Sequence, residues 1–263
     1  PWLFGYFYDT FTQYGNRKGD SSPYYDGESL LAITKAAKYL GNRYIHLWPM
    51  AAGTAQALHK THVEQALEED EDSNETKGAY QWLSMTLFEL ATVTFGEGYT
   101  ERFDLPYAIS DIYPQNQFGT WLVEMALWMI DVHETLRKGR NTGYAYEGIV
   151  PAWAWISHVV SQNDNDPHLA KTARKLECTI EKGMSKLMSW QVGMGAEKQA
   201  ESLWNGIDGL GGVQNAKDES GLRIDVTQHQ MHATILTRRL VYPPLGDESW
   251  PWSQVDISGS KAL

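Results

Sequence analysis

Four segments of the chain begin with the same kinds of residues, and this repetition restricts the fold more than any other feature. Each has aromatic or small polar residues followed by an apolar run, at residues 24–31, 78–83, 118–122 and 146–153. A second segment with helical periodicity follows each opening. Paired helices whose alternate members begin with polar and aromatic groups predict a toroid of helical hairpins. We therefore expect an all-α fold with a site at the helix openings.

Helical periodicity covers most of the chain. The predicted helices lie at residues 26–41, 43–68, 78–95, 103–113, 119–136, 149–160, 167–190 and 225–239. Gly41 is a helix stop, Pro49 an interruption or kink, and Asp166 an N-cap before Pro167. Residues 68–75 form an acidic, solvated link and residues 191–222 a glycine-rich loop. The whole chain, residues 1–263, is predicted to form one (α/α) barrel domain. Its helical body spans about residues 24–240, between an irregular aromatic N-terminal arm and an irregular C-terminal tail.

Composition narrows the range of partners. The net charge of −11 disfavours nucleic acid, anionic membranes and other polyanions. The apolar runs are far shorter than the roughly 20 residues of a transmembrane helix. The single cysteine, Cys178, excludes an internal disulfide and reads as a buried, inert thiol. We expect a soluble protein of unassigned compartment and oligomeric state, whose abrupt start at Pro1 suits a mature or trimmed form.

The helix openings carry a resemblance. The phrase Tyr25-Asp26-Gly27-Glu28-Ser29-Leu30-Leu31-Ala32 and the opening Gly78-Ala79-Tyr80-Gln81-Trp82 resemble the six-hairpin (α/α) barrels of carbohydrate-active enzymes. That superfamily includes glycosidases, uronate lyases and sugar epimerases. The likeness spans roughly residues 24–240, with about five hairpins where relatives have up to six. It implies an oligo- or polysaccharide as substrate, and either hydrolysis, elimination or epimerisation as the reaction.

Two carboxylates are candidates for glycosidic cleavage, which needs one protonated and one ionised carboxyl group across a cleft. Glu147 precedes an apolar helix, where partial burial favours a general acid. Asp225 stands beside Arg223, which favours its ionised form. This carboxylate pair is the preferred mechanism. The alternative for each acid, taken alone, is a helix cap that satisfies first-turn amides.

Histidines on the last helix support a second mechanism. Asp225, Gln228, His229 and His232 form one polar stripe, because residues three and four apart share a helix face. His229 could move the proton alpha to a uronate carboxylate, with Arg223 neutralising that carboxylate. The stripe also permits a divalent metal at Asp225, His229 and His232, although no cofactor is expected. The alternative is a buried histidine bonded to Gln228 or to a backbone carbonyl.

Further residues at the openings are candidates for substrate binding. Aromatic side chains there could stack on sugar rings, and acids and amides could bind hydroxyls. These candidates are Tyr25, Asp26, Glu28, Tyr80, Trp82, Trp121, Trp153, Gln228 and His232. The alternative for each tryptophan is a place in the core. A non-catalytic sugar-binding or assembly toroid would use the same residues without turnover. The remaining six histidines are interpreted as surface or structural residues without partners.

Overall fold

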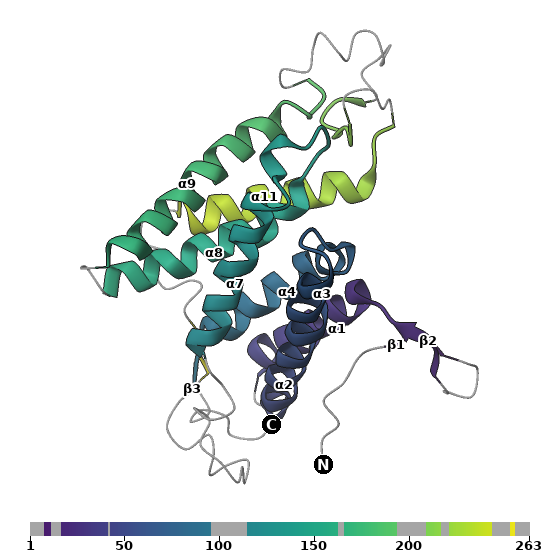
Figure 1. The fold of residues 1–263 in the computed structure, drawn as a ribbon, viewed down its shortest axis with the longest axis vertical. Coiled ribbons are helices and arrows are strands. Elements are labelled where there is room, and N and C mark those ends of the chain that lie inside the picture. The colour runs from purple at the N-terminus through teal and green to yellow at the C-terminus, as the bar shows by residue number, and fades with distance from the viewer. Residues whose placement is uncertain are drawn as a thin grey trace. The chain divides into compact units, whose positions relative to one another are not determined.

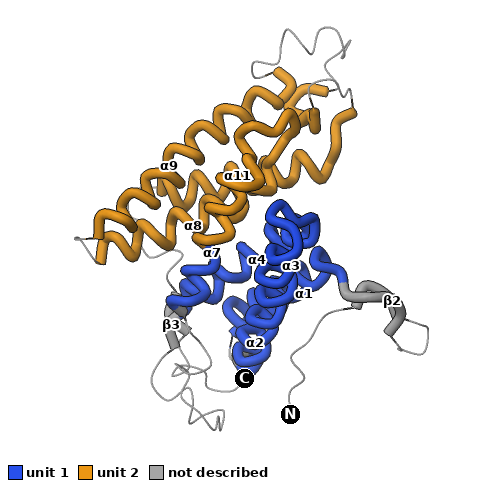
Figure 2. The backbone as a smooth tube through the Cα atoms, in the orientation of Figure 1, with its two compact units in different colours: residues 1–122, 248–263 blue, residues 123–247 orange. Residues whose placement is uncertain are grey.

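The computed structural model describes residues 8–11, 17–41, 43–95, 115–162, 166–193, 209–216, 221–243 and 253–255. These residues are mostly helical, which confirms the all-α expectation at the level of class (Figure 1). The chain divides into two compact units, residues 1–122 with 248–263 and residues 123–247 (Figure 2). The prediction of one barrel across residues 1–263 stays a prediction. Among the described residues, no helix has the length and apolar content needed to cross a membrane.

The first unit is built around two long helices that pack against each other. Its helical elements are α1 (Pro23–Tyr39), η1 (Ile45–Leu47), α2 (Trp48–His59), η2 (Lys60–Gln65), α3 (Ala66–Glu69) and α4 (Asn74–Ala91). The helix α1 packs on α4 and α2. Gly27 permits the close approach of α1 to α4, because a Cβ there would lie 2.8 Å from the Cβ of Trp82. Leu30, Tyr80 and Leu83 are fully buried in this core.

Local signals explain where these helices begin and end. Pro49 was predicted as an interruption or a kink of one long helix. It lies in the first turn of α2, where its missing N–H costs nothing, so the chain starts a new helix after η1 and is not kinked at Pro49. Ser73 caps α4 by accepting hydrogen bonds from the backbone N–H groups of Glu75 and Thr76. The segment η2 is a turn of π-helix between α2 and α3. Gly41 follows α1 with a φ of +79°, as a helix stop requires.

Short strands occur in both terminal regions, where only irregular structure was predicted. β1 (Tyr8–Phe11) and β2 (Arg17–Ser21) pair antiparallel, with Tyr8 opposite Ser21 and Phe11 opposite Arg17. β3 (Val93–Phe95) pairs parallel with β4 (Ser253–Val255). Residues 93–95 were predicted as the end of a helix and are instead this strand. The predicted helix at residues 103–113 lies outside the described residues.

The second unit places one helix between two others. Its elements are η3 (Thr135–Arg137), α8 (Gly143–Gln162), α9 (Pro167–Met188) and α11 (Ile224–Leu240), together with the C-terminal part of α7 (Gln115–Asp131). The helix α8 packs on both α9 and α11 (Figure 1). Asp166 caps α9 as predicted, accepting from the N–H groups of His168 and Leu169. The thiol of Cys178 is exposed on α9, so the prediction of a buried thiol was wrong.

Candidate functional site: a buried glutamate between two histidines

A carboxylate and two imidazoles meet between α8 and α11. The Nδ1 atom of His229 lies 3.0 Å from Oε2 of Glu147, and Nδ1 of His232 lies 2.5 Å from Oε1. The Glu147 side chain is 1% exposed, whereas those of His229 and His232 are 18% and 40% exposed. Each carboxylate oxygen therefore has a histidine partner, and both partners are more exposed than the carboxylate. We call these three residues the Glu147 cluster.

The cluster fixes the tautomer of both rings when Glu147 is ionised. An ionised carboxylate oxygen can only accept a hydrogen bond, so each Nδ1 atom must carry the proton that it donates. A neutral ring then has its lone pair on Nε2. A ring held by a carboxylate at one nitrogen and basic at the other is the arrangement that orients a general base. The half-exposed ring of His232 is the more accessible of the two.

Close packing at the start of α8 brings Glu147 to the two histidines. A Cβ at Gly143 would lie 2.7 Å from the backbone nitrogen of Gln230, so only glycine permits this helix crossing. Glu147 stands four residues further along α8, on the same face as Gly143. On α11, His229 and His232 are three residues apart and share the face that points toward Glu147.

A buried amide pair holds the same crossing in register. Asn141 accepts a hydrogen bond from the backbone N–H of Gly143 at 2.9 Å, which caps α8. Its Nδ2 atom donates to Oε1 of Gln230 on α11 at 2.8 Å. Both side chains are buried. Since Gln230 lies between the two histidines in sequence, this bond ties the start of α8 to the part of α11 that carries them.

Tyr146 fixes α8 on its other side. Its ring lies against Gly183 of α9, where an added Cβ would come within 1.9 Å of the ring carbon Cζ. The ring is fully buried, and burial raises the pKa of its hydroxyl. That hydroxyl has no hydrogen-bond partner among the described residues. Adjacent residues of α8 thus contact different helices, Tyr146 facing α9 and Glu147 facing α11.

The other half of the predicted carboxylate pair lies at the surface. Asp225 forms a two-point ion pair with Arg223, at 3.1 Å from Nε and 2.5 Å from Nη2. Both side chains are about half exposed. Hydrogen bonding from Arg223 is the main cause that lowers the pKa of Asp225. Within the described part of the chain, no hydrogen bond or ion pair joins Asp225 to Glu147, and Gln228 is exposed on the same helix.

The first unit contains a second carboxylate and histidine cluster, which sequence reasoning missed. His62 lies between Asp26, at 3.0 Å from Nε2, and Glu75, at 2.6 Å from Nδ1. His62 and Asp26 are buried, while Glu75 is 45% exposed. Burial lowers the pKa of His62, but hydrogen bonds and charges from the two acids outweigh it and raise the pKa overall. With both nitrogens engaged and the ring buried, His62 is an internal cation that links α1, η2 and α4.

Two similar tripeptides mark the clusters in the sequence. Tyr25-Asp26-Gly27 lies within the first two turns of α1 and Tyr146-Glu147-Gly148 within the first two turns of α8, and the acid of each tripeptide is buried against a histidine. An acid between an aromatic residue and glycine at a helix opening was therefore the available signal. The interpretation of His62 as a residue without partners was wrong, and so was that of His133, which bonds the hydroxyl of Tyr144 at 3.0 Å.

A buried lysine and glutamate form a third charged cluster, at the far end of α1. Lys38 lies 2.9 Å from Oε2 of Glu89, and Lys35 lies 2.7 Å from Oε1. Burial lowers the pKa of Lys38, and the two lysines keep the pKa of Glu89 below its usual value despite burial. The hydroxyl of Tyr39 also donates to Glu89. Since both lysines of α1 pair with the one carboxylate of Glu89 on α4, we interpret the cluster as a structural link between these helices.

The predicted aromatic binding residues divide between surface and core. Tyr25 is half exposed, and Tyr24 contacts both Tyr25 and Trp82 edge to face. Trp121 stacks on His59, with ring centroids 4.0 Å apart. Tyr80 is fully buried, so it packs in the core rather than at a surface. Glu28 is exposed on α1, whereas Trp153 is partly exposed on α8.

The predicted metal ligands do not converge. In the described ranges, no group of three or more His, Cys, Asp or Glu side chains is arranged to hold a metal ion. The imidazoles of His229 and His232 contact Glu147, and Asp225 contacts Arg223. A metal ion at Asp225, His229 and His232 stays a prediction.

No known family model, curated protein or solved structure matches this chain. The resemblance to six-hairpin barrels likewise stays a prediction.

Proposed function

We propose that the chain is a carbohydrate-active enzyme in which histidine, held by Glu147, moves a proton on a uronate sugar. The observation that carries the proposal is the Glu147 cluster, in which a buried carboxylate contacts Nδ1 of two partly exposed histidines. The geometry favours this mechanism over cleavage by a carboxylate pair. Both oxygens of Glu147 already contact histidines, and Asp225 is engaged with Arg223 at the surface.

The chemistry suits a carbon acid. The hydrogen alpha to a uronate carboxylate is removed as a proton by Nε2 of His232 or His229. In elimination, the electron pair left on carbon forms a double bond to the neighbouring carbon, whose bond to the glycosidic oxygen breaks. The leaving oxygen then takes up a proton. In epimerisation, the same carbon is instead reprotonated from the opposite face. Either reaction would use the (α/α) toroid that the helix openings predict.

Arg223 is the proposed partner of the substrate carboxylate. It precedes the first turn of α11, six residues before His229. At 1.5 Å per residue the two positions lie about 9 Å apart along the helix axis. A positive charge near the carboxylate stabilises the carbanion that forms when the alpha proton leaves. Without substrate, Arg223 is paired with Asp225. A substrate carboxylate would have to displace Asp225 from Arg223 or bind Arg223 alongside it.

The test is exchange of the alpha hydrogen in heavy water. Wild-type protein is incubated in D₂O with polygalacturonate, alginate or chondroitin, and NMR follows deuterium at the carbon next to the carboxylate. The unsaturated product of elimination is measured by its ultraviolet absorbance. We expect His232→Gln or His229→Gln to lower the rate about a hundredfold or more, the usual contribution of an acid–base group. His168→Gln, which changes an exposed histidine of α9, is the matched control and should leave the rate unchanged.

The positioning role of Glu147 has its own readout. In Glu147→Gln, the amide oxygen can accept from one imidazole, but the amide nitrogen can only donate to the other. One histidine should therefore change tautomer, which ¹⁵N NMR of the imidazoles detects without any substrate. Full turnover in His232→Gln and His229→Gln contradicts the mechanism. Uronan binding by wild type without exchange or cleavage identifies a sugar-binding toroid instead.

A further inference from the structure

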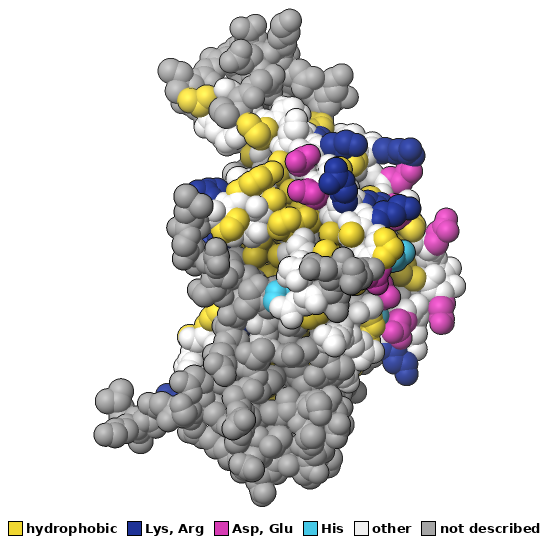
Figure 3. Space-filling model, turned by 90° about the vertical axis from the view of Figure 1, so that its left-hand side faces the viewer, with side chains coloured by type: hydrophobic (Ala, Val, Ile, Leu, Met, Phe, Trp, Pro, Cys, Tyr) yellow, Lys and Arg dark blue, Asp and Glu magenta, His cyan; other side chains and the backbone are white. Residues whose placement is uncertain are grey.

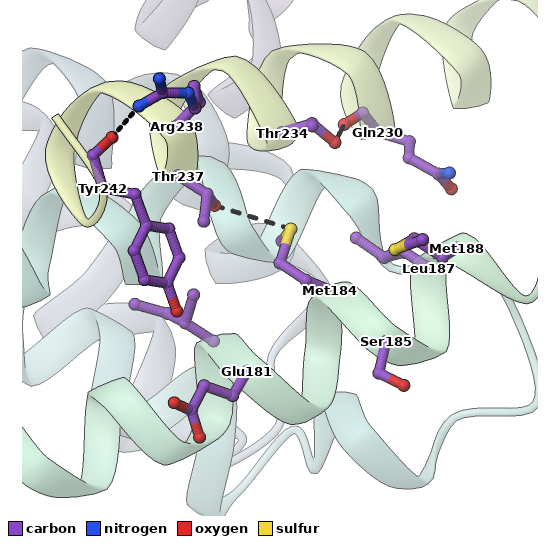
Figure 4. Close-up of a pocket in the computed structure, with 11 residues that line it drawn as sticks. Glu181, Met184, Ser185, Leu187, Met188, Gln230, Thr234, Thr237, Arg238 and Tyr242 are labelled. Atoms are coloured by element: carbon purple, nitrogen blue, oxygen red, sulfur yellow. Dashed lines mark hydrogen bonds between the residues drawn. The ribbon is translucent and has the colours of Figure 1, made fainter. Parts of the chain in front are cut away.

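A groove between α9 and α11 is separate from the contacts of the Glu147 cluster. It has a volume of about 510 Å³ and is lined only by residues of α9, of α11 and of the turn after it (Figure 4). Leu187, Met184 and Met188 form one wall, and Thr234, Thr237 and Tyr242 form the other. Small-molecule sites in proteins usually measure about 300–1,000 Å³. The groove is therefore large enough for a ligand.

The threonine hydroxyls and the Gln230 side-chain oxygen of the α11 wall are already hydrogen-bonded within the protein. The hydroxyl of Thr234 donates to the carbonyl of Gln230 at 2.8 Å, and that of Thr237 donates to the carbonyl of Ala233 at 2.8 Å. The side-chain oxygen of Gln230 accepts from Asn141. These residues consequently offer the groove mainly their carbon atoms. A sugar would lose hydrogen bonds to water here without replacing them.

Charge is also directed away from the groove. Arg238 donates through Nη1 to the backbone carbonyl of Tyr242, and in Figure 4 its side chain runs along α11 rather than across to α9. Glu181 stands at the same end, so a ligand there would meet one charge of each sign. The end formed by Leu187, Met188 and Gln230 has no charged lining residue among those described.

The apolar groups of the groove remain accessible. Met188 is 49% exposed and Tyr242 is 54% exposed. On the face shown in Figure 3, apolar side chains form a band beside a cluster of Lys, Arg, Asp and Glu side chains. Two methionines in one wall give it a flexible, polarisable surface that adapts to ligand shape. Burial of such groups by a ligand is favourable because it removes apolar surface from water.

We propose that the groove binds an uncharged ligand with a flexible alkyl chain. The volume suits a small molecule, the bonded threonine hydroxyls leave few polar groups for a sugar, and Glu181 at the same end as Arg238 disfavours an anion. The alkyl chain lies between the methionines of α9 and the threonine methyl groups of α11. This site goes beyond the proposed uronate chemistry and does not depend on it.

The test uses 1-decanol as the probe on the full chain. The methionine methyl groups are labelled with ¹³C, and NMR follows Met184 and Met188 as the alcohol is added. Saturable shifts of these two signals are expected. Thr234→Trp fills the groove and should weaken binding at least tenfold. Thr227→Trp changes a threonine of the same helix that also bonds its i−4 carbonyl but does not line the groove, and it should bind like wild type.

Four outcomes overturn the proposal. One is the absence of saturable shifts, and another is equal binding by Thr234→Trp and wild type. Tighter binding of decanoate than of decanol would show that a positive charge, and not apolar contact, selects the ligand. The last outcome is a wild-type protein that binds no decanol but sediments as a dimer, with Thr234→Trp sedimenting as a monomer. The groove would then be an interface between two copies of the chain.

Discussion

Histidines contact buried carboxylates in both units, but the two arrangements have different consequences. His62 is buried with an acid at each nitrogen, so it stabilises the first unit as a cation. His229 and His232 share one acid, and both rings are partly exposed. The same residue types thus give an internal ion pair in one unit and a chemically accessible pair in the other. One imidazole with two carboxylates gives the internal ion pair, and two imidazoles with one carboxylate give the accessible pair.

The raised pKa of His62 predicts how stability depends on pH. A histidine whose pKa is higher in the folded state stabilises the protein fully below its unfolded pKa of 6.5. That contribution is lost as the pH rises through the folded pKa. At a pH well below 6.5, we expect His62→Gln to lower the free energy of unfolding by about 3 kcal/mol, because it leaves buried Asp26 without its cation. Urea unfolding of both proteins across the pH range measures the difference, which should shrink at alkaline pH.

The neighbouring histidine supplies the control for this prediction. Burial lowers the pKa of His59 to about 4, so His59 favours the folded state when neutral and opposes it in acid. Its contribution therefore has the opposite sign and must be measured separately with His59→Gln. A difference between wild type and His62→Gln that is constant with pH would contradict the assignment of His62 as a cation.

At the scale of single residues, the sequence predicted which residues form the Glu147 cluster but not that they contact one another. Glu147, His229 and His232 were all candidate site residues, because their types and helix positions are visible in the sequence. Their meeting was not predictable, since 82 and 85 residues separate the histidines from Glu147. Helical spacing says which side chains share a face. It does not say what that face contacts, which depends on tertiary packing.

At the scale of elements, α8 depends on small residues in its neighbours. Gly183 of α9 leaves the space that the Tyr146 ring occupies. We expect Gly183→Ala to destabilise the second unit by about 1–3 kcal/mol or more, the usual cost of overpacking a core. Gly139→Ala is the matched control, because no atom lies within 4 Å of the added Cβ. Thermal unfolding of both variants measures the effect.

A double-mutant cycle separates packing from helix propensity. Tyr146→Leu removes the ring that the new methyl group would meet, so Gly183→Ala should cost less in that background. An equal cost in both backgrounds would mean that Tyr146 is not the residue that requires glycine at position 183.

Element boundaries show where sequence patterns were sufficient. Caps and turn residues placed the start of α9 correctly, because Asp166 and Pro167 act through local chemistry. The start of α8 was predicted at Ile149 but lies at Gly143. Gly143 and Gly148 weaken the helical pattern, yet the close crossing with α11 stabilises the helix through them. Pro49 was predicted as an interruption or a kink and lies in the first turn of α2, because a proline at either place gives the same sequence signature.

At the scale of the whole molecule, each of the two units is compact in itself, so we expect substitutions in one to act mainly within it. We expect His62→Gln to speed amide hydrogen exchange in α1 and α4, and Gly183→Ala to speed it in α8 and α9. Hydrogen-exchange mass spectrometry of peptides from both units tests this. Equal acceleration in both units by either substitution would instead indicate that the chain unfolds as one cooperative body.

Tyr146 and Glu147 are adjacent on α8 but contact different helices. Their positions therefore depend on the number of residues in the first turn of α8. Consecutive helical residues point about 100° apart, so one residue step separates the direction of α9 from that of α11. Inserting or deleting one residue between Gly143 and Tyr146 would turn the helix by that angle and carry the acid away from its histidines. Loop changes before Asn141 would leave this geometry intact. The first turn of α8 is therefore expected to tolerate neither a side chain at Gly143 nor a different number of residues.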